Sequence, residues 1–255
     1  MMTYSEPEFL FYPQLESTNT ELKHLISVKK LPEYSVVISA DQTAGRGQTG
    51  NHWESEKNAN LTFSLLLRPK LLAPHLQFYI SKIVSLGIID AIKKLTDIEA
   101  KIKWPNDIYI NDKKVAGILI ENSILGPQLD YCIVGIGLNV NQVNFTSDAP
   151  NPVSLKNISG TSYNLENTLK VVLEHIHLRY DQLQIHHSEL INKNYMNSLY
   201  RNKGFFDFRD KQGLFNARID KINEFGLMTL VDTKGKEREY AFKEVSFILS
   251  SKAND

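Results

Sequence analysis

Lysines and polar side chains that could do chemistry interrupt an apolar stretch in the middle of the chain. The run Lys103–Asp107 is followed by the turn-forming pair Asn111-Asp112 and then by Lys114. Such a pair predicts a hairpin, which would bring Lys114 back toward Asp107. A lysine at the start of a strand offers positive charge to a phosphate on which negative charge develops. The alternative is an exposed, charged hairpin tip, and Lys113 fits that alternative.

A glycine-rich loop earlier in the chain is a second candidate site. The segment Gly45–Gly50 contains Arg46, and Trp53 follows it. Closely spaced glycines let backbone N–H groups converge on an anion, and a guanidinium adds a forked donor. No Gly-Lys-Ser or Gly-Lys-Thr follows, so the loop is not a P-loop. A flexible surface loop explains the glycines equally well, but Trp53 favours a site because its ring is a stacking surface for a base.

Two shorter motifs also suit ligand binding. In Ser17-Thr18-Asn19, Thr18 matches a capping box with Glu21, and a helix start gathers free N–H groups that suit a carboxylate or a carbonyl. The segment Gly135–Asn139 lacks the third glycine and the following helix of a dinucleotide fingerprint. We therefore reject dinucleotide binding, although glycines at a strand end still allow close approach of a ligand.

The histidines and the cysteine do not form a predicted metal site. His175 and His177 lie on different faces of a predicted helix, and His186-His187 are adjacent, so neither pair has metal-ligand spacing. Cys132 lies in an apolar run, which favours a core residue over a nucleophile.

A mixed α/β domain followed by a small β domain must position these residues. Hydrophobic periodicity predicts helices over residues 17–30, 75–95 and 165–183. Short apolar runs predict strands over residues 35–40, 61–67, 100–103, 107–110, 115–120 and 131–136. The long segment 41–60 has no apolar period, and long loops in compact domains are often functional. Short strand patterns separated by glycines dominate the end of the chain, so we predict domains 1–203 and 204–255.

Composition limits the classes of function. The chain has 255 residues, 42% of them hydrophobic, with 29 basic and 29 acidic side chains. This balance gives no broad basic face for nucleic acid. One cysteine excludes an internal disulfide, and the N-terminus lacks the pattern of a secretory signal, which together indicate a cytoplasmic protein. No apolar stretch has the length of a membrane span.

Taken in order, the motifs resemble those of the biotin–protein ligase family, also called biotin–acetyl-CoA-carboxylase ligases. The resemblance covers the whole first domain, and it rests on these segments: Ser17-Thr18-Asn19, Gln42, Ala44–Gly47, Trp53, Lys103–Asp107, Lys114–Gly117 and Gly137–Asn139. It implies a mixed central sheet flanked by helices, with a small SH3-like β domain at the C-terminus. It also implies a two-step reaction with ATP and Mg²⁺: biotin is activated as biotinyl-5′-AMP and then transferred to a lysine of a biotin carboxyl carrier protein domain.

The resemblance also assigns roles to individual residues. Lys114, Arg46 and Asp107 would be catalytic. Biotin would be bound by Ser17, Thr18, Asn19, Gln42, Arg46, Gly47, Gln48, Lys114 and Gly117. ATP and the adenylate would be bound by Arg46, Gly47, Trp53, Asn106, Lys114 and Asn139, with Trp53 stacked on adenine. No protein ligand is assigned to magnesium, which would arrive with ATP. Family members are often dimers, so a homodimer is a further expectation, although no interface is assigned.

Two features depart from the family. Many bacterial members have an arginine at the position of Gln48, where it helps to hold the adenylate, so we expect weaker retention of the adenylate here. Some members begin with a helix-turn-helix domain, but only about 16 residues precede Ser17, so we expect no DNA binding.

Three other interpretations remain open at this point. A lipoate–protein ligase or octanoyl transferase of the same superfamily would share the fold and the lysine, but Gly45-Arg46-Gly47 followed by Trp53 resembles the biotin branch. A non-catalytic biotin or nucleotide sensor would have no need of Lys114, because binding depends on shape more than on transition-state charge. A purely structural α/β domain would leave the Asn, Gly and Trp residues of the loops unexplained.

Overall fold

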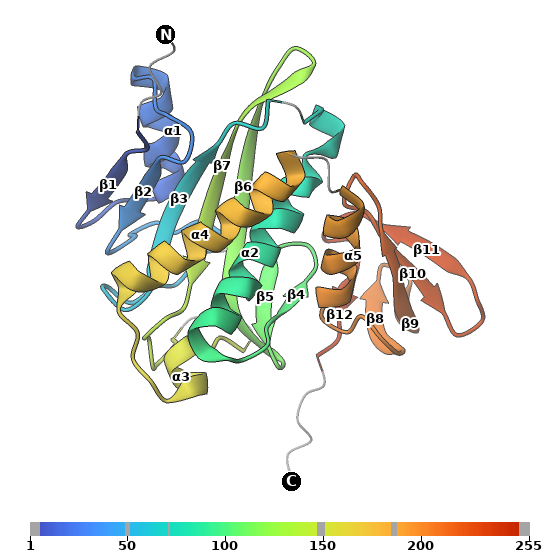
Figure 1. Cartoon of the computed structure of the whole chain (residues 1–255). Coiled ribbons are helices and arrows are strands. Elements are labelled where there is room, and N and C mark those ends of the chain that lie inside the picture. Colours follow the sequence, from blue (N-terminus) through green and yellow to red (C-terminus); the bar gives the residue numbers. More distant parts are fainter. Residues whose placement is uncertain (1–5, 49–51, 71, 147–150, 185–187, 250–255) are drawn as a thin grey trace.

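The chain forms two β-sheets and five α-helices within the residues described by a computed structural model, which are 6–48, 52–70, 72–146, 151–184 and 188–249 (Figure 1). The larger sheet has seven strands, in the spatial order β1 (Phe9–Tyr12), β2 (Val36–Ser39), β3 (Leu61–Leu67), β7 (Gln128–Leu138), β6 (Lys113–Leu125), β5 (Asp107–Ile110) and β4 (Lys101–Lys103). Strands β1 and β2 are parallel and the other neighbours antiparallel, so the sheet is mixed, as predicted.

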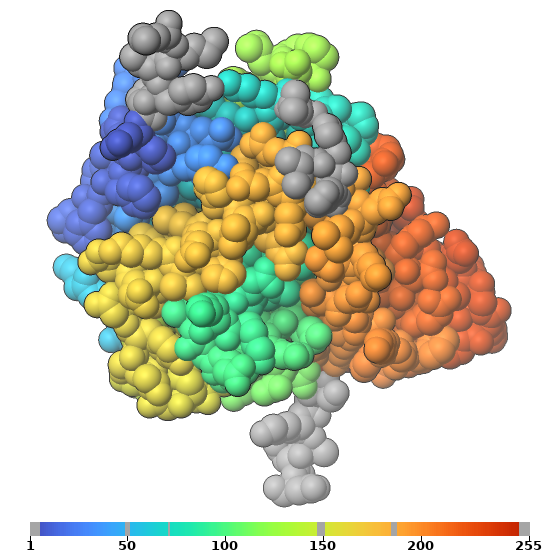
Figure 2. All heavy atoms as spheres, viewed as in Figure 1, coloured from blue at the N-terminus to red at the C-terminus, as the bar shows by residue number. Residues whose placement is uncertain are grey.

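Helices cover both faces of this sheet. On one face, α2 (Phe78–Thr96) and α4 (Leu165–Gln184) pack together, and their atoms cover much of the sheet in the space-filling view (Figure 2). On the other face, α1 (Thr18–Val28) contacts β2, β3 and β7. Successive strand residues point to opposite faces. Leu65 therefore packs into the core under α2 and α4, and Leu66 into the smaller core with Leu22 of α1. Because both sides are covered, every residue of β3 is buried.

Most of the predicted elements are confirmed. Some predicted strands are shorter than the observed ones, and four observed elements were not predicted. Strands β3 and β5 match the predicted ranges, and β6 and β7 extend beyond theirs into a long hairpin. The missed elements are β1, the 3₁₀ helix η1 (Pro74–Leu76), α3 (Leu155–Ser159) and α5 (Ser188–Ser198). In α5 only Ile191 and Tyr195 are buried, which is too weak a stripe for periodicity to detect. Residues 49–51 and 185–187, which include His186-His187, lie outside the described residues.

A second, antiparallel sheet follows α5. Its strands are β8 (Phe206–Asp210), β9 (Gly213–Ile222), β10 (Met228–Asp232), β11 (Glu237–Tyr240) and β12 (Ser246–Phe247). We propose a domain boundary between residues 203 and 204, because α5 packs on α2 and β8 opens the second sheet. The two parts meet closely: Trp104 Nε1 donates a hydrogen bond to the carbonyl of Gly226 at 2.9 Å, across this boundary. None of the described helices is long and apolar enough to cross a membrane.

A buried lysine lies between α2 and α5. Lys82 is only 1% exposed, and its Nζ donates a hydrogen bond to Asn192 Oδ1 at 2.8 Å. The ammonium lies 4.8 Å from the ring centroid of Tyr79, with Phe78 and Tyr195 also within cation–π range. Burial lowers the pKa of Lys82 to about 8, although the charge of Glu224 opposes this shift. The charged lysine therefore carries a desolvation cost that the aromatic rings offset only in part.

We expect Lys82→Met to stabilise the protein below pH 8 and to flatten part of its pH dependence. The folded state releases the proton near pH 8 and the unfolded chain near 10.5, so the wild-type free energy of unfolding should rise over that interval. The total rise in the free energy of unfolding over this interval should be on the order of 3 kcal/mol. Urea unfolding of both proteins between pH 6 and 10.5 measures the difference. A gap between wild type and variant that stays constant over this range would contradict the prediction.

Candidate active site

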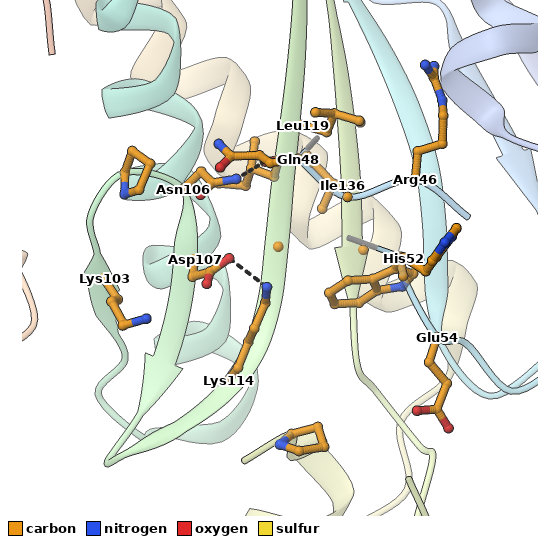
Figure 3. Close-up of a pocket in the computed structure, with 18 of the residues that line it drawn as sticks. Arg46, Gln48, His52, Glu54, Lys103, Asn106, Asp107, Lys114, Leu119 and Ile136 are labelled. Carbon is orange, nitrogen blue, oxygen red and sulfur yellow. Dashed lines mark hydrogen bonds and ion pairs between the residues drawn. The ribbon is translucent and has the colours of Figure 1, made fainter. Parts of the chain in front are cut away.

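The predicted site residues lie around one cavity of about 750 Å³ on the α1 side of the large sheet (Figure 3). All of those named from the sequence line it: Ser17, Thr18, Asn19, Gln42, Arg46, Gly47, Gln48, Trp53, Asn106, Asp107, Lys114, Gly117 and Asn139. Residues of the C-terminal part also contribute, including Phe242 and Lys243 between β11 and β12 and Phe247 of β12. A cavity of this size falls within the range of small-molecule sites.

Lys114 and Asp107 form an ion pair inside the cavity. Their Nζ and Oδ1 atoms are 2.7 Å apart, and both side chains are about three-quarters buried, being 24% and 22% exposed. The predicted hairpin is confirmed, with Asn111 in the left-handed conformation of its turn at φ +54°. This arrangement confirms the expected return of Lys114 toward Asp107. Lys113 at the same turn is exposed, which confirms the prediction that it belongs to the solvent-facing tip of the hairpin.

A β-bulge directs Lys114 into the site. Asp107 pairs with Gly117 and Tyr109 pairs with Lys114, so the intervening segment of β6 has one more residue than that of β5. In a regular strand, residues 114 and 117 would point to opposite faces. The extra residue reverses this relation, and a Cβ placed on Gly117 would lie 3.4 Å from Lys114 Nζ. The bulge therefore places the lysine over the glycine side of the sheet.

Trp53 lies on a depression made by two glycines. Gly117 and Gly137 are direct partners across β6 and β7. A Cβ on Gly137 would be 2.2 Å from the indole Cε2, and one on Gly117 would be 3.0 Å from Cζ3. Only glycine permits this approach at residue 137. Lys114 Nζ lies 5.6 Å from the indole centroid, and Trp53 Nε1 is buried without a hydrogen-bond partner among the described residues. In this structure the indole makes the close approach to these glycines, and the predicted approach of a ligand stays a prediction.

The start of α1 is held by side-chain hydrogen bonds. Asn19 is 3% exposed; its Oδ1 accepts from Ser64 Oγ at 2.6 Å and its Nδ2 donates to Glu121 at 2.7 Å. The backbone N–H of Thr18 donates to Gln42 Oε1 at 2.8 Å. The predicted Thr18–Glu21 capping box is wrong, because Ser17 occupies the N-cap position without a side-chain cap and Glu21 instead accepts from Tyr12.

Arg46 does not point at Lys114 in this structure. Its guanidinium pairs with Glu121 at 3.0 Å, and its side chain extends away from the Lys114–Asp107 pair (Figure 3). Both members of the pair are partly exposed, at 43% and 32%, so the ion pair is weak and easily exchanged. Contact of Arg46 with a carboxylate or phosphate therefore requires a change of partner, and it stays a prediction.

Two asparagines also line the cavity. Asn106 Nδ2 donates to the carbonyl of Ile118, and Asn139 Nδ2 donates to that of Val153 at 3.1 Å. Asn139 is buried, and its Oδ1 has no hydrogen-bond partner in the described part of the chain. A buried acceptor without a donor is costly, and an amino group of a bound base would satisfy it.

Sequence reasoning missed some of the residues that shape the site. Glu121 connects Asn19 with Arg46, and no local pattern predicts partners 102 and 75 residues away. The contribution of Phe242, Lys243 and Phe247 depends on how the second sheet packs against the first. Lys103 belongs to the Lys103–Asp107 run, but the sequence did not indicate a function for it, although it lines the cavity.

One carboxylate of the cavity suits magnesium that arrives with a nucleotide. Within the described ranges, no three His, Cys, Asp or Glu side chains gather as a metal site. Mg²⁺ in nucleotide enzymes is commonly held by one or two carboxylates and the substrate phosphates. Asp107 supplies a carboxylate beside Lys114, which fits that pattern. Cys132 is fully buried and burial raises its pKa to about 12, so it lacks the thiolate of a nucleophile.

The sheet, the lysine-bearing hairpin and the glycine-rich loop together define a class of acid-activating ligase. Residues 11–139 match the model of the Biotin/lipoate A/B protein ligase family, and the chain belongs to that family. It is 28% identical over 245 residues to the bifunctional ligase/repressor BirA of Bacillus spizizenii, covering 92% of this chain and 73% of that protein. It is 38% identical over 130 residues to the biotin–[acetyl-CoA-carboxylase] ligase of Paracoccus denitrificans, covering 49% of this chain and 51% of that protein.

Solved structures agree with this assignment. The biotin protein ligase from Aquifex aeolicus in complex with biotin and ATP superimposes with a TM-score of 0.79 at 25% identity, covering 95% of this chain and 99% of that chain. The predicted fold class, a mixed central sheet flanked by helices and followed by a small β-sheet, is confirmed.

Proposed function

We propose that this chain is an ATP-dependent ligase that activates biotin as biotinyl-5′-AMP and transfers it to a lysine of a biotin carboxyl carrier protein domain. The observation that carries the proposal is the Lys114–Asp107 pair, held at 2.7 Å inside the same cavity as Trp53 and Asn19. Biotin protein ligases, one solved with biotin and ATP, share the fold over nearly the whole chain, which supports the choice of substrates.

In the first step, the biotin carboxylate attacks the α-phosphate of ATP and pyrophosphate leaves. Both reactants are anions, so the barrier falls when fixed cations and backbone donors neutralise their charge. Lys114 supplies a cation at the meeting point, and the bulge of β6 holds it there. Asp107 orients the ammonium group. Magnesium bound with ATP would draw charge from the phosphates, with Asp107 as its protein ligand.

The remaining lining residues divide between the two substrates. We propose that Ser17, Thr18, Asn19 and Gln42 surround the ureido ring of biotin, which needs both donors and acceptors. Asn19 Oδ1 accepts from Ser64 and keeps a second lone pair as an acceptor, while its Nδ2 already donates to Glu121 and to the carbonyl of Leu119. Thr18 and Gln42 are already fixed to each other. We propose that the adenine stacks on Trp53, with the orphaned Oδ1 of Asn139 accepting from its amino group. Gly47 and Gly117 allow close backbone approach to the ligands.

In the second step, the adenylate acylates the acceptor lysine and AMP leaves. A mixed anhydride reacts with water, so the glycine-rich loop that carries Arg46 must cover it between the two steps. We propose that Arg46 exchanges Glu121 for the ligand when it does so, because the Arg46–Glu121 pair is partly exposed and weak. The reaction uses ATP and a carboxylase domain, and we place it in the cytoplasm. A homodimer remains a prediction that the sedimentation of the purified chain would test.

Incubation with ATP, Mg²⁺, biotin and a recombinant carrier domain tests the whole reaction. We expect intact-mass spectrometry to show one biotinyl group on the carrier domain. A carrier domain whose acceptor lysine is replaced by arginine is the control, and it should stay unmodified. Failure to modify the wild-type domain, with biotin and ATP both bound, would contradict the proposal.

We expect Gln48→Arg to retain the adenylate longer than the wild type. Gln48 lines the cavity, and a neutral amide binds a phosphate less strongly than a guanidinium does. One added charge-assisted hydrogen bond corresponds to roughly tenfold slower release. Release of labelled biotinyl-5′-AMP into filtrate, without an acceptor, measures the effect. Gln48→Glu is the matched control and should speed release. Equal release from all three proteins would show that this position does not hold the adenylate.

A further inference from the structure

Lys103 is a cation in the cavity that forms no ion pair with any of the described residues. It begins the Lys103–Asp107 run at the end of β4. Its Nζ instead lies 5.0 Å from the ring centroid of Tyr109 and 5.5 Å from that of Phe247. Burial lowers the pKa of Lys103, with Asp107 opposing and Lys114 and Arg201 adding to the shift. A desolvated cation of this kind gains more than an exposed one from an anionic ligand.

The nearest carboxylate is engaged elsewhere. Lys103 and Asp107 are direct partners across β4 and β5, so their side chains share a face, but Asp107 pairs with Lys114. Figure 3 shows Lys103 and Lys114 on either side of Asp107. The described cavity wall as a whole has four basic side chains, Arg46, Lys103, Lys114 and Lys243, against the acids Glu54 and Asp107. Its formal charge is therefore positive.

The second sheet closes this end of the cavity. Phe247 of β12 contacts Lys103 from across the proposed domain boundary, and Phe242, Lys243 and Ser246 of the same part of the chain also line the cavity. Lys103 is thus held between a strand of the first sheet and a strand of the second. If the α-phosphate of a bound nucleotide lay at Lys114, phosphates that extend from there toward the second sheet would reach Lys103.

We propose that Lys103 and the adjoining wall of the second sheet form the subsite for the β- and γ-phosphates of ATP and for the departing pyrophosphate. This inference rests on the proposed function. As the biotin carboxylate oxygen bonds to the α-phosphorus, the bond from that phosphorus to the bridging oxygen breaks, and the oxygen leaves with the electron pair on pyrophosphate. Lys103 stabilises the negative charge that the leaving group gains, while Lys114 acts at the α-phosphate.

Separating the two half-reactions tests this assignment. Lys103→Met keeps the aliphatic stem that packs on the two rings but removes the charge. We expect the KM for pyrophosphate in the biotin-dependent exchange into ATP to rise at least about tenfold, the loss of one charge-assisted contact. Transfer from chemically prepared biotinyl-5′-AMP to the carrier domain contains no pyrophosphate, so its rate should stay within about twofold. Lys103→Arg should restore exchange.

Lys101→Met is the matched control. Lys101 lies on the same strand and face, undergoes the same change of charge, and does not line the cavity. Its exchange kinetics should match the wild type. Equal losses in exchange and in transfer by Lys103→Met would show a structural role between the sheets and overturn the proposal, as would unchanged exchange. If the wild type itself gave no exchange with biotin, the proposed function would fail instead.

Discussion

Replacing Lys114 by methionine should lower the rate of biotin-dependent pyrophosphate exchange by about a thousandfold. Removal of one fixed electrostatic group from a reaction of this type costs a factor of about 10² to 10³. The larger value is expected here because Lys114 would face both the carboxylate and the α-phosphate. Methionine keeps an aliphatic stem of similar length and removes only the ammonium group that lies 5.6 Å from the Trp53 ring, so the cavity wall should persist. Exchange of labelled pyrophosphate into ATP at saturating substrates measures the loss.

The neighbouring lysine provides the control for Lys114. Lys113 is part of the same hairpin and is exposed. Lys113→Met should change the exchange rate by less than about twofold, because exposed charges contribute little. Full activity in Lys114→Met would remove the lysine from the mechanism and favour a role in binding alone. Comparable losses in both variants would point to the hairpin fold and not to the ammonium group.

Gly135→Ala should weaken biotin binding by at least about tenfold, the equivalent of roughly 1.4 kcal/mol. A Cβ on Gly135 would lie 2.3 Å from Oδ1 and 2.9 Å from Cγ of Asn19. Asn19 cannot simply rotate away, because Ser64 and Glu121 hold its two ends in a buried position. The amide proposed to bind the ureido ring must therefore shift. Calorimetric titration with biotin measures the change in Kd.

A glycine at the tip of the same hairpin is the control for Gly135→Ala. Gly126, between β6 and β7, has φ +59°, and nothing lies within 4 Å of a Cβ placed on it. Gly126→Ala should cost stability through its backbone conformation but leave biotin affinity unchanged. Unchanged affinity in Gly135→Ala would separate Asn19 from biotin binding. Loss of affinity in both variants would indicate a general loss of fold.

The sequence predicted the cavity lining better than it predicted how that lining is oriented. Apart from β1, the strands of the large sheet are marked by short apolar runs, and the residues named from the ordered motifs line one cavity. The bulge in β6 depends on register with β5, which no single segment contains. The sequence therefore predicted Lys114 as a site residue. The bulge that turns its side chain toward the site is explained only by the register between β5 and β6.

Partners distant in sequence account for the other differences. Thr18 matched a capping box in its local pattern, but Ser64 Oγ of β3 lies 2.8 Å from its hydroxyl group. Arg46 has a plausible ligand-binding position in the sequence, yet Glu121 on β6 takes its guanidinium in this structure. Helix α5 buries only two residues, so tertiary contact with α2 and not hydrophobic periodicity accounts for it. Each case reflects packing that overrides a local preference.

Pyrophosphate exchange into ATP, measured on the wild type with biotin, lipoate and octanoate in turn, tests most directly whether this chain activates biotin. We predict exchange with biotin and Mg²⁺, and only background exchange with the other two acids. Asn19 and its neighbours are polar and suit the ureido ring of biotin, whereas lipoate and octanoate offer no polar group at that end. Exchange that depends on lipoate or octanoate and not on biotin would contradict the proposed substrate and assign the chain to the lipoate branch of its family.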